Sequence, residues 1–431
     1  MITATKGLCP ICLKQISATR IFRDGAWYQE KECPQHGKFS TVIWRGSEDM
    51  EAWIGAKENA AQEEKLPCPD ACGLCEKHLR NTCCALLEVT DRCNLRCRFC
   101  FADNTQKADL PLEKIKEQIR DLAEKTNGAL LQISGGEPTL RDDLPEIVAF
   151  AKEVGCKYIQ LNTNGIRLAN DPAYVRALSE AGLSFVFLQF DGVDDEVYQT
   201  LRGEPLFKVK EKAIELCGKE RLGVTLVPTL VPGVNTHQIG DIIRYVIANV
   251  PVIRGVHFQP VSYFGRIPQL PDDAKRYTLG ELVDDIVEQT AGLISRKSLV
   301  PSACDHPLCG LHGDYIALSA DKILALSERG RPETSCCSHE DPAVQNREYI
   351  ATRWQRNDDG SYCTNEDPSS LKGFLQWKQH RGFAITSMCF QDAGNLDLER
   401  LRRCSLHVYR NGHIVPFCAA YLSGFHNELV E

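Results

Sequence analysis

The sequence lacks a long apolar run, a secretion signal and a clustered basic region. No apolar run among the 431 residues approaches the roughly 20 residues of a membrane span, and the N-terminal residues do not resemble a signal peptide. The formal net charge is −8, and acidic and basic residues are interspersed. Nucleic-acid binding would need a clustered basic face. We therefore expect a cytoplasmic protein with no membrane span and no nucleic-acid partner.

Cysteine, in contrast, is abundant. The chain has 21 cysteines, many of them in CxxC-type spacings. An odd number of closely spaced cysteines without a secretion signal favours metal ligation over disulfides. We therefore expect oxygen-labile metal centres in a reducing compartment.

The middle of the chain, residues 85–262, alternates between strand and helix patterns. Leu112, Ile115, Ile119 and Leu122 recur at helical spacing and predict one buried helix face. Helical crossovers between successive strands make the sheet parallel. The expected fold is therefore α/β, with the sheet curled as a partial (β/α)6 barrel. The expected strands are residues 85–90, 129–133, 157–161, 185–190, 224–230 and 255–261.

The most informative motif is Cys93-Asn-Leu-Arg-Cys97-Arg-Phe-Cys100, directly after the first expected strand. A four-iron cluster is normally held by four cysteines. Three closely spaced ligands leave one iron open, as a catalytic zinc keeps a free position. The open iron can chelate a small molecule through an amine and a carboxylate. A cysteine-rich zinc loop would not explain the Ser134-Gly-Gly-Glu-Pro138 segment one βα unit downstream.

Small and polar residues follow the next expected strands. The two glycines of Ser134-Gly-Gly-Glu-Pro138 let backbone approach a ligand, and its glutamate offers a carboxylate to an ammonium group. Asn164 suits a ribose or an amino-acid moiety. Each residue alone could belong to a turn, but their recurrence after successive strands favours binding. The predicted cofactor contacts are Phe99, Gly135, Gly136, Glu137, Asn164, Gln189 and Asp191.

The N-terminal segment contains two knuckles, Cys9-Pro-Ile-Cys12 and Cys33-Pro-Gln-His36. Two such turns point four ligands at one tetrahedral ion, as in zinc ribbons and rubredoxin-like sites. Residues 19–28 between them predict a small hairpin that turns at Asp24-Gly25. Alternatively, His36 is a surface residue and another residue supplies the fourth ligand. The choice between zinc and iron stays open.

A second CxxxCxxC motif, Cys68-Pro-Asp-Ala-Cys72-Gly-Leu-Cys75, precedes the first expected strand. It has no strand before it and no aromatic residue before its third cysteine. Cys83 and Cys84 lie close by in the sequence, so a fourth thiolate is available. These features favour a closed auxiliary four-iron cluster at Cys68, Cys72, Cys75 and Cys83, with a second zinc site as the alternative.

The cysteine-rich segment after residue 300 shows little strand–helix alternation. Metal ligation can supply the stabilisation that apolar burial would not. We therefore expect a further iron–sulfur cluster, with ligands chosen among eight cysteines. The expected ligands are Cys304, Cys309, Cys404 and Cys418. The expected buried apolar cysteines are Cys156, Cys217, Cys363 and Cys389.

The cysteine loop and its downstream segment resemble the radical S-adenosylmethionine (SAM) superfamily, whose signature is CxxxCxΦC with an aromatic Φ, here Phe99, followed by GGEP. The resemblance implies that Cys93, Cys97 and Cys100 hold a catalytic [4Fe–4S] cluster and that GGEP binds the methionyl end of SAM. The superfamily cleaves SAM reductively to a 5′-deoxyadenosyl radical, which abstracts hydrogen from an unactivated carbon. A low-potential donor such as ferredoxin or flavodoxin is the expected partner.

A narrower resemblance covers nearly the whole chain. The order CPxC, CPxHG, CPxxCGLC, CNLRCRFC and CxHPxCG is similar to the archaeal tetraether-lipid synthase group and to the bacterial radical SAM (seleno)protein TrsS relatives. This resemblance implies a mononuclear iron or zinc site, one or two auxiliary [4Fe–4S] clusters, and coupling of alkyl carbons. The polar residues 347–373 do not indicate a lipid tunnel, so the substrate is either lipid-like or another small molecule.

The chain divides into four expected parts. These are a metal knuckle at 1–60, an auxiliary-cluster segment at 61–84, the radical SAM core at 85–300 and a C-terminal auxiliary-cluster region at 301–431. The expected function is C–H functionalisation by a radical SAM enzyme. The alternatives are a radical SAM methyltransferase, a peptide-modifying enzyme of the SPASM type, and an iron–sulfur electron-transfer protein.

Overall fold

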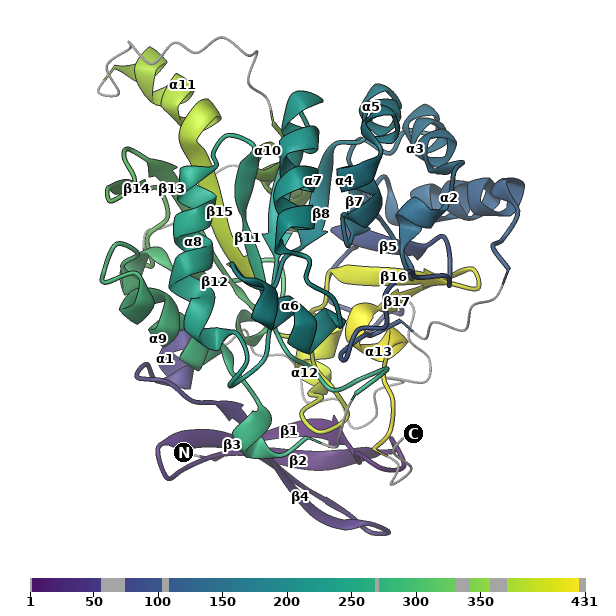
Figure 1. Cartoon of the computed structure of the whole chain (residues 1–431). Helices are drawn as coiled ribbons and strands as arrows, with labels where there is room; N and C mark the ends of the chain where they lie inside the picture. The colour runs from purple at the N-terminus through teal and green to yellow at the C-terminus, as the bar shows by residue number, and fades with distance from the viewer. Residues whose placement is uncertain are drawn as a thin grey trace.

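A computed structural model describes residues 2–55, 74–102, 108–267, 271–330, 342–356 and 370–425. Its N-terminal strands are β1 (Ile2–Leu8), β2 (Gln15–Arg23), β3 (Ala26–Cys33) and β4 (Gly37–Trp44). They form an antiparallel sheet of their own, at the bottom of Figure 1. Asp24 and Gly25 have φ angles of 49° and 78° and join β2 to β3. This left-handed pair makes the expected two-residue hairpin turn.

Six parallel strands form the centre of the second sheet. They are β5 (Cys84–Glu88), β6 (Leu130–Ser134), β7 (Ile159–Thr163), β8 (Phe185–Gln189), β9 (Gly223–Val227) and β11 (Ile253–Pro260). They lie side by side in chain order. Such an order follows from right-handed helical crossovers between neighbouring parallel strands. The predicted partial (β/α)6 barrel is confirmed.

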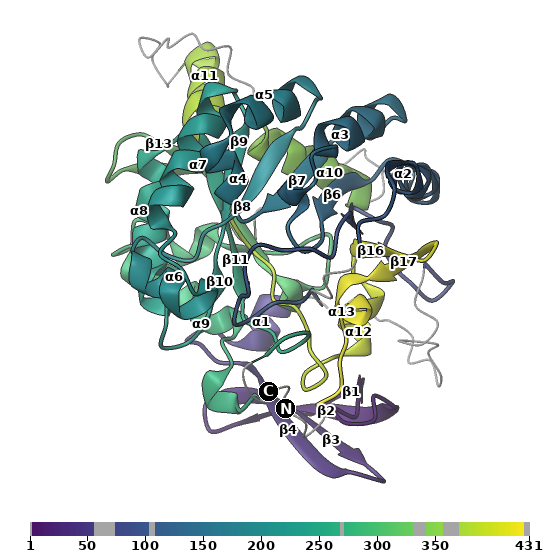
Figure 2. The ribbon, with the colours of Figure 1, turned by 45° about the vertical axis from the view of Figure 1, so that its right-hand side comes forward.

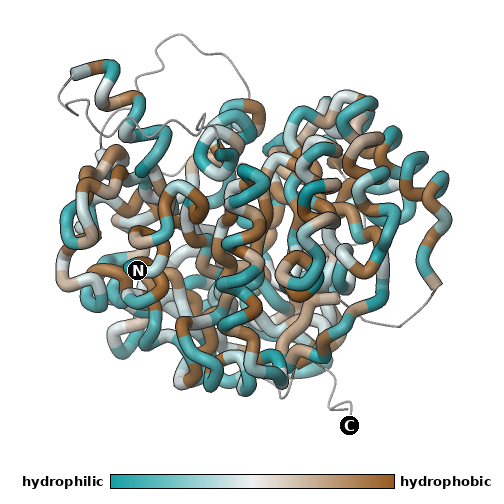
Figure 3. Tube along the Cα trace, turned by 45° about the horizontal axis from the view of Figure 1, so that its top comes forward, coloured by the Kyte–Doolittle hydropathy of each residue, from teal (hydrophilic) through white to brown (hydrophobic). Residues whose placement is uncertain are grey.

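Helices connect these strands and cover the outer face of the sheet (Figure 2). They are α2 (Leu112–Thr126), α3 (Leu144–Glu153), α4 (Ile166–Asn170), α5 (Pro172–Glu180), α6 (Asp195–Arg202), α7 (Phe207–Lys219) and α8 (Ile239–Ala248). Ile115, Ile119 and Leu122 of α2 are fully buried, as their spacing predicts. Polar and apolar residues alternate along the covering helices (Figure 3), which is the pattern of helices with one face on a core.

The remaining elements lie outside this set of strands and covering helices. The helices are α1 (Met50–Ile54), α9 (Leu279–Gln289), α10 (Pro342–Trp354), α11 (Leu371–Arg381), α12 (Leu398–Arg402) and α13 (Phe417–Ala420). The strands are β10 (Thr229–Leu230), β12 (Val300–Pro301), β13 (Leu311–Ala317), β14 (Ile323–Ala325), β15 (Gly382–Ser387), β16 (Leu406–Arg410) and β17 (His413–Pro416). Short 3₁₀ turns occur at Pro138–Leu140, Thr236–Gln238, Asp273–Lys275, Arg296–Ser298 and Pro307–Cys309.

The C-terminal region contains more regular structure than its sequence predicts. β15 pairs in parallel with β11, and β13 follows it, which extends one edge of the barrel sheet. β16 pairs in parallel with β5 and extends the other edge. The expectation of little strand–helix alternation was wrong, because these strands are short and find their partners only at the two open edges of the barrel. The four-part division of the chain stays a prediction.

The N-terminal sheet is attached to the loop that precedes α12. Arg20 of β2 donates hydrogen bonds of 3.1 and 2.5 Å to the carboxylate of Asp397, and Thr5 of β1 donates a third of 2.9 Å. Lys31 of β3 donates to the carbonyl oxygen of Ala393 (3.1 Å). A buried charge pair of this kind is costly to break, so it fixes the sheet against the C-terminal region. No helix among the residues placed by the structure is long and apolar enough to cross a membrane.

Candidate active site and metal centres

The loop with the three cysteines is fixed by the residues after β6. The Gly136 amide donates a hydrogen bond of 2.7 Å to the Thr90 carbonyl oxygen. The Glu137 amide donates one of 2.7 Å to the Arg92 carbonyl oxygen. A Cβ on Gly135 (φ +138°) would lie 2.3 Å from the Thr90 oxygen, and one on Gly136 would lie 2.2 Å from that of Arg92. The sequence predicts that these glycines let a ligand approach the backbone. Because they have no Cβ, they also let the cysteine loop pack against this segment.

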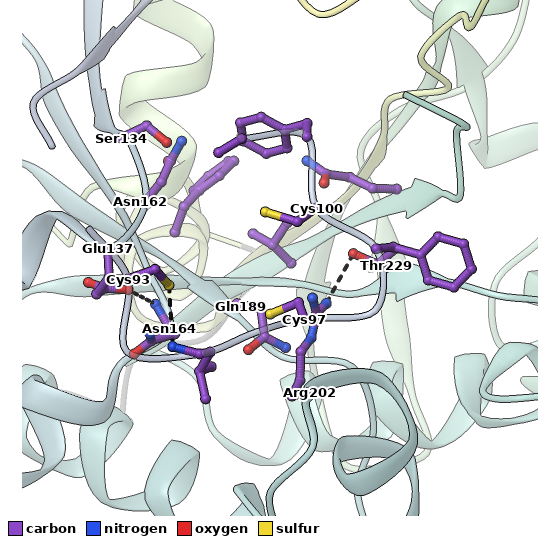
Figure 4. Close-up of a pocket in the computed structure, with 18 of the residues that line it drawn as sticks. Cys93, Cys97, Cys100, Ser134, Glu137, Asn162, Asn164, Gln189, Arg202 and Thr229 are labelled. Atoms are coloured by element: carbon purple, nitrogen blue, oxygen red, sulfur yellow. Dashed lines mark hydrogen bonds between the residues drawn. The ribbon is translucent and has the colours of Figure 1, made fainter. Parts of the chain in front are cut away.

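Cys93, Cys97 and Cys100 line one cavity of about 220 Å³ at the C-terminal ends of the parallel strands. Their sulfur atoms face a common space (Figure 4). The C-terminal ends of parallel strands are where α/β barrels place their active sites. The predicted contacts that also line this cavity are Phe99, Gly135, Gly136, Glu137, Asn164 and Gln189.

Two of the three thiols are shifted toward their neutral form. Burial raises the pKa of Cys93 to about 11, and the charges of Glu137 and the other two cysteines add to the effect. Burial also raises the pKa of Cys100. Thiols become ligands as thiolates, and a bound cation favours that form. The arrangement therefore fits an iron–sulfur cluster, whose irons supply that charge.

Glu137 is buried and makes its hydrogen bonds within the protein. Its Oε1 accepts from the Thr139 amide (3.1 Å), the Thr139 hydroxyl (2.6 Å) and the Thr163 hydroxyl (2.6 Å). Its Oε2 accepts from the Asn164 amide (2.7 Å). The carboxylate thus joins the ends of β6 and β7, which lie side by side. Its expected contact with an ammonium group stays a prediction.

Asn164 and Gln189 are connected through a buried lysine that was not among the residues predicted from the sequence. Lys210 of α7 donates hydrogen bonds to the Asn164 carbonyl oxygen (2.6 Å) and to Gln189 Oε1 (2.8 Å). Burial lowers the pKa of Lys210 to about 7. Asn164 Nδ2 donates to Asn94 Oδ1 (2.7 Å) in the cysteine loop. The amides at the ends of β7 and β8 are thereby held in one arrangement beside the cavity.

Asp191, expected as a cofactor contact, does not line the cavity. It is fully buried and accepts hydrogen bonds of 2.6 and 2.7 Å from Arg202 at the end of α6. Arg202 does line the cavity and is close enough to hydrogen-bond the Cys97 thiol. Although burial alone would lower the pKa of Arg202, the charges of Asp191 and Cys97 raise it. The residue that lines the cavity is therefore the arginine. The sequence gave no sign of this, because Arg202 follows the strand end by a whole helix, α6.

The N-terminal knuckles bring their four predicted ligands together. The ligand atoms of Cys9, Cys12, Cys33 and His36 all lie within 4.8 Å of one another. Cys33 Sγ is 3.4 Å from His36 Nδ1 and 4.0 Å from Cys12 Sγ. A tetrahedral zinc with Zn–S bonds near 2.3 Å separates two sulfurs by about 3.8 Å. The spacing therefore fits one tetrahedral ion, and three cysteines with one histidine are a zinc donor set.

A second cavity, near α12, is lined by four cysteines from four segments of the C-terminal region. They are Cys309, Cys389, Cys404 and Cys418. Burial raises the pKa of Cys418 to about 12 and that of Cys389 to about 12. Four thiols around one enclosed space are the donor set of a closed four-iron cluster. Cys389 was expected to be a buried apolar residue; it packs against the apolar core and, in addition, lines this cavity.

Cys304, expected in the same ligand set, faces a different group. Its thiol is hydrogen-bonded to that of Cys83 and lies 3.1 Å from the Ser405 hydroxyl. The Cys84 sulfur is 3.7 Å from the Cys83 sulfur. The adjacent residue Asp305, not Cys304, lines the four-cysteine cavity. Cys68 and Cys72 lie outside the described residues, so the expected cluster at Cys68, Cys72, Cys75 and Cys83 stays a prediction.

One residue is shared by the two cavities. Phe390 lines both the three-cysteine cavity and the four-cysteine cavity. Its ring stacks on that of Phe417, with centroids 4.3 Å apart, and contacts that of Phe264. The three-cysteine and four-cysteine cavities therefore meet at this aromatic residue.

Comparisons with known families agree with this geometry. The model of the radical SAM superfamily matches residues 87–246. The model of the HMPTM N-terminal zinc ribbon domain matches residues 1–45. The first of these regions contains the three-cysteine loop and strands β6 to β9, and the second contains all four N-terminal ligands.

Curated relatives extend the similarity. The chain is 42% identical over 308 residues to the 7,8-dihydro-6-hydroxymethylpterin dimethyltransferase of Methanocaldococcus jannaschii, which covers 69% of this chain and 60% of that protein. It is 32% identical over 176 residues to a probable GTP 3′,8-cyclase of Methanothermobacter thermautotrophicus, which covers 39% of this chain and 55% of that protein. The chain thus spans less than two thirds of the length of these relatives.

Solved structures include SuiB of Streptococcus suis bound to the precursor peptide SuiA. It has a TM-score of 0.41 and 20% identity, and the match covers 50% of this chain and 48% of that chain. The narrower resemblance to tetraether-lipid synthases and TrsS relatives stays a prediction. The superfamily model, the curated relatives and the three-cysteine cavity agree on the broader assignment: residues 87–246 match the radical SAM superfamily, whose cofactors are SAM and a [4Fe–4S] cluster.

Proposed function

We propose that this chain is an enzyme that cleaves SAM at a [4Fe–4S] cluster held by Cys93, Cys97 and Cys100, and functionalises an unactivated C–H bond. When bound, the reduced cluster and SAM supply a 5′-deoxyadenosyl radical that removes a hydrogen atom. The observation that carries the proposal is the shared cavity, in which the three sulfurs face the Gly135–Glu137 segment. A pure electron carrier would have no use for an open iron beside such a cavity.

The protein's own residues position the reactants. Arg202 places a permanent positive charge beside Cys97, within hydrogen-bonding reach of its sulfur. Glu137 holds the backbone amide of Asn164 in place, so that the polar ends of β6 and β7 present a fixed surface to SAM. Phe187, Phe264 and Phe390 form an apolar part of the wall. Such a wall excludes water and protects a radical from unwanted hydrogen donors.

Auxiliary clusters support a net oxidation or a coupling, because both require electrons to leave or enter the substrate. We assign one cluster to Cys309, Cys389, Cys404 and Cys418, which lie across Phe390 from the SAM cavity. A second cluster would use Cys68, Cys72, Cys75 and Cys83. Ferredoxin or flavodoxin is the expected reductant, and a cytoplasmic location is proposed with it.

The second candidate function is methyl transfer. It is favoured by the 42% identity to a protein named as a dihydrohydroxymethylpterin dimethyltransferase and by the zinc ribbon model over residues 1–45. A pterin would use the polar edge of the cavity, whereas the apolar wall suits an alkyl chain. The two candidates therefore differ in substrate and share the cysteine site.

The proposal is tested by anaerobic reconstitution with iron and sulfide, followed by dithionite and SAM. We expect 5′-deoxyadenosine and methionine from the wild type and none from Cys97→Ala. The matched control is Cys217→Ala, which removes a buried cysteine of α7 that packs in the apolar core. If the wild type with full iron content yields no 5′-deoxyadenosine, the chain does not cleave SAM and the electron-transfer alternative gains support.

Deuterium transfer identifies the substrate class. Perdeuterated lipids, peptides and a reduced pterin are each incubated with the reconstituted enzyme and SAM. The expected result is deuterium in 5′-deoxyadenosine from an alkyl or pterin substrate. Transfer from a peptide alone would contradict the small-molecule and lipid assignment and favour the peptide-modifying alternative.

A further inference from the structure

Arg400 of α12 is a buried cation, and no described carboxylate forms an ion pair with it. Its exposed fraction is 6%, and no ion pair among the residues placed by the structure includes it. Three other buried arginines have bidentate carboxylate partners. These pairs are Arg141–Asp143, Arg202–Asp191 and Arg276–Asp392. Burying a charge without compensation is costly, so Arg400 requires another source of negative charge.

Backbone carbonyls do not meet this need. Arg347, which is also buried, donates four hydrogen bonds to carbonyl oxygens. Arg400 donates one such bond, of 2.8 Å, from its Nη2 to the Cys389 carbonyl oxygen. Its Nε is buried and has no hydrogen-bond partner. The guanidinium is therefore incompletely satisfied by the protein.

The groups that Arg400 faces are cysteines. It lines the four-cysteine cavity and is within hydrogen-bonding reach of the Cys309 thiol. The Cys418 and Cys389 thiols also act on it electrostatically. Asp305 also lines the cavity, but its Oδ1 accepts hydrogen bonds from the amide (2.7 Å) and hydroxyl (2.9 Å) of Ser405. The negative charge that would compensate Arg400 is thus that of a centre bound in the cavity.

We propose that Arg400 is the fixed countercharge of the iron–sulfur cluster held by Cys309, Cys389, Cys404 and Cys418, and that it raises the reduction potential of this cluster. The inference rests on the cluster assignment made above. Reduction adds one negative charge to the cluster, and a buried cation stabilises the reduced form more than the oxidised form. A higher potential makes the cluster a better one-electron acceptor. Arg400 acts through the cluster and does not contact the SAM cavity.

The test is a potentiometric titration followed by electron paramagnetic resonance. It uses reconstituted full-length protein in which Cys93, Cys97 and Cys100 are alanines, so that the SAM cluster gives no signal. The signal of the C-terminal centre is identified by its loss in Cys418→Ser. Arg400→Gln, Arg400→Lys and Arg402→Gln are then compared. Arg402 is the control, because it lies on the same helix and is buried, but it donates to the Lys77 carbonyl oxygen and pairs with the Glu399 carboxylate (3.4 Å).

Arg400→Gln should lower the midpoint potential of the cluster by at least about 59 mV. At the wild-type midpoint potential, a fall of this size raises the ratio of oxidised to reduced cluster about tenfold for a one-electron couple. Arg400→Lys and Arg402→Gln should stay near the wild type. Equal potentials for wild type and Arg400→Gln at full iron content would overturn the proposal. If Arg400→Gln loses iron while Arg400→Lys keeps it at the wild-type potential, the countercharge is supported. If both lose iron, the role is structural and the proposal fails.

These outcomes are independent of SAM cleavage. The potential is measured without SAM, whereas the proposed enzymatic function is read from 5′-deoxyadenosine in the protein with its native cysteine loop. Absence of 5′-deoxyadenosine therefore leaves the potentiometric result valid, and an unchanged potential leaves SAM cleavage unaffected.

Discussion

The carboxylate of Asp191 holds the guanidinium of Arg202 with two hydrogen bonds of 2.6 and 2.7 Å, in a pair that is almost completely buried. Asp191 also accepts a hydrogen bond from the Thr229 amide (3.1 Å). The aspartate thus connects the ends of β8 and β10 with α6. It thereby fixes the position of the Arg202 cation, which is within hydrogen-bonding reach of Cys97 in the SAM cavity.

Breaking this pair should be strongly destabilising. Asp191→Asn leaves the Arg202 cation buried without its partner, and such a loss costs about 3–5 kcal/mol. We expect a lower thermal midpoint, measured by circular dichroism, and reduced 5′-deoxyadenosine formation. The control is Glu215→Gln, which breaks an exposed pair with Lys219 and should change stability by less than about 1 kcal/mol. Equal effects of the two substitutions would contradict the role of Asp191.

Glu137→Gln tests the carboxylate that joins β6 and β7. In this variant an NH2 group replaces one carboxylate oxygen, so a donor would face the donors from which that oxygen now accepts. A hydrogen bond to a charged group contributes about 1.5–3 kcal/mol. We expect SAM to bind at least about tenfold more weakly, measured by equilibrium dialysis of the reconstituted protein. Thr163→Val removes one of the four donors and should weaken binding less. Unchanged SAM affinity in Glu137→Gln would show that this network does not shape the site.

The reassigned C-terminal ligands are tested by comparing Cys389→Ala with Cys304→Ala. Cys389 lines the four-cysteine cavity, whereas Cys304 is hydrogen-bonded to Cys83. We expect Cys389→Ala to lose the C-terminal cluster, which is about four irons per chain. Cys304→Ala should leave this cluster's resonance signal intact. The reverse pattern would restore the ligand set first expected from the sequence.

Removing the metal from the N-terminal site should leave the iron content of the protein unchanged. Cys12→Ser removes one of four ligands within 4.8 Å of one another. We expect the loss of one equivalent of zinc, measured by plasma mass spectrometry, with the iron content retained. Cys156→Ser is the control, because this cysteine is fully buried in the apolar core. Iron at one equivalent in place of zinc would identify a rubredoxin-like site.

Stability should depend on pH through a buried histidine pair. His78 Nε2 and His407 Nε2 are 3.2 Å apart, and burial lowers the pKa of both. Both stay neutral in the folded protein below the ordinary histidine pKa of about 6.5, whereas the unfolded chain takes up protons there. Stability is therefore fully present above that pH and is lost as the pH falls below it. Thermal midpoints at pH 7.5 and 5.5 should differ less in His407→Gln than in the wild type, and equal differences would refute this account.

Local patterns were sufficient for much of the fold. The alternation of strands and helices between residues 85 and 262 predicted all six central strands, because buried parallel strands and amphipathic helices each have a characteristic period. The edge strands β13, β15 and β16 were missed. They pair with β11 and β5, which lie far away in the sequence, and no local pattern records a distant partner.

The three-cysteine loop was singled out in the sequence by the strand before it, by Phe99 and by the GGEP segment downstream. Spacing alone was not sufficient, because Cys68, Cys72 and Cys75 have the same CxxxCxxC spacing as Cys93, Cys97 and Cys100. Tertiary structure alone decided that Arg202, not Asp191, faces the cavity and that Cys389, not Cys304, joins the C-terminal cysteines. Such sets are assembled from several elements, and their membership depends on how side chains pack in three dimensions.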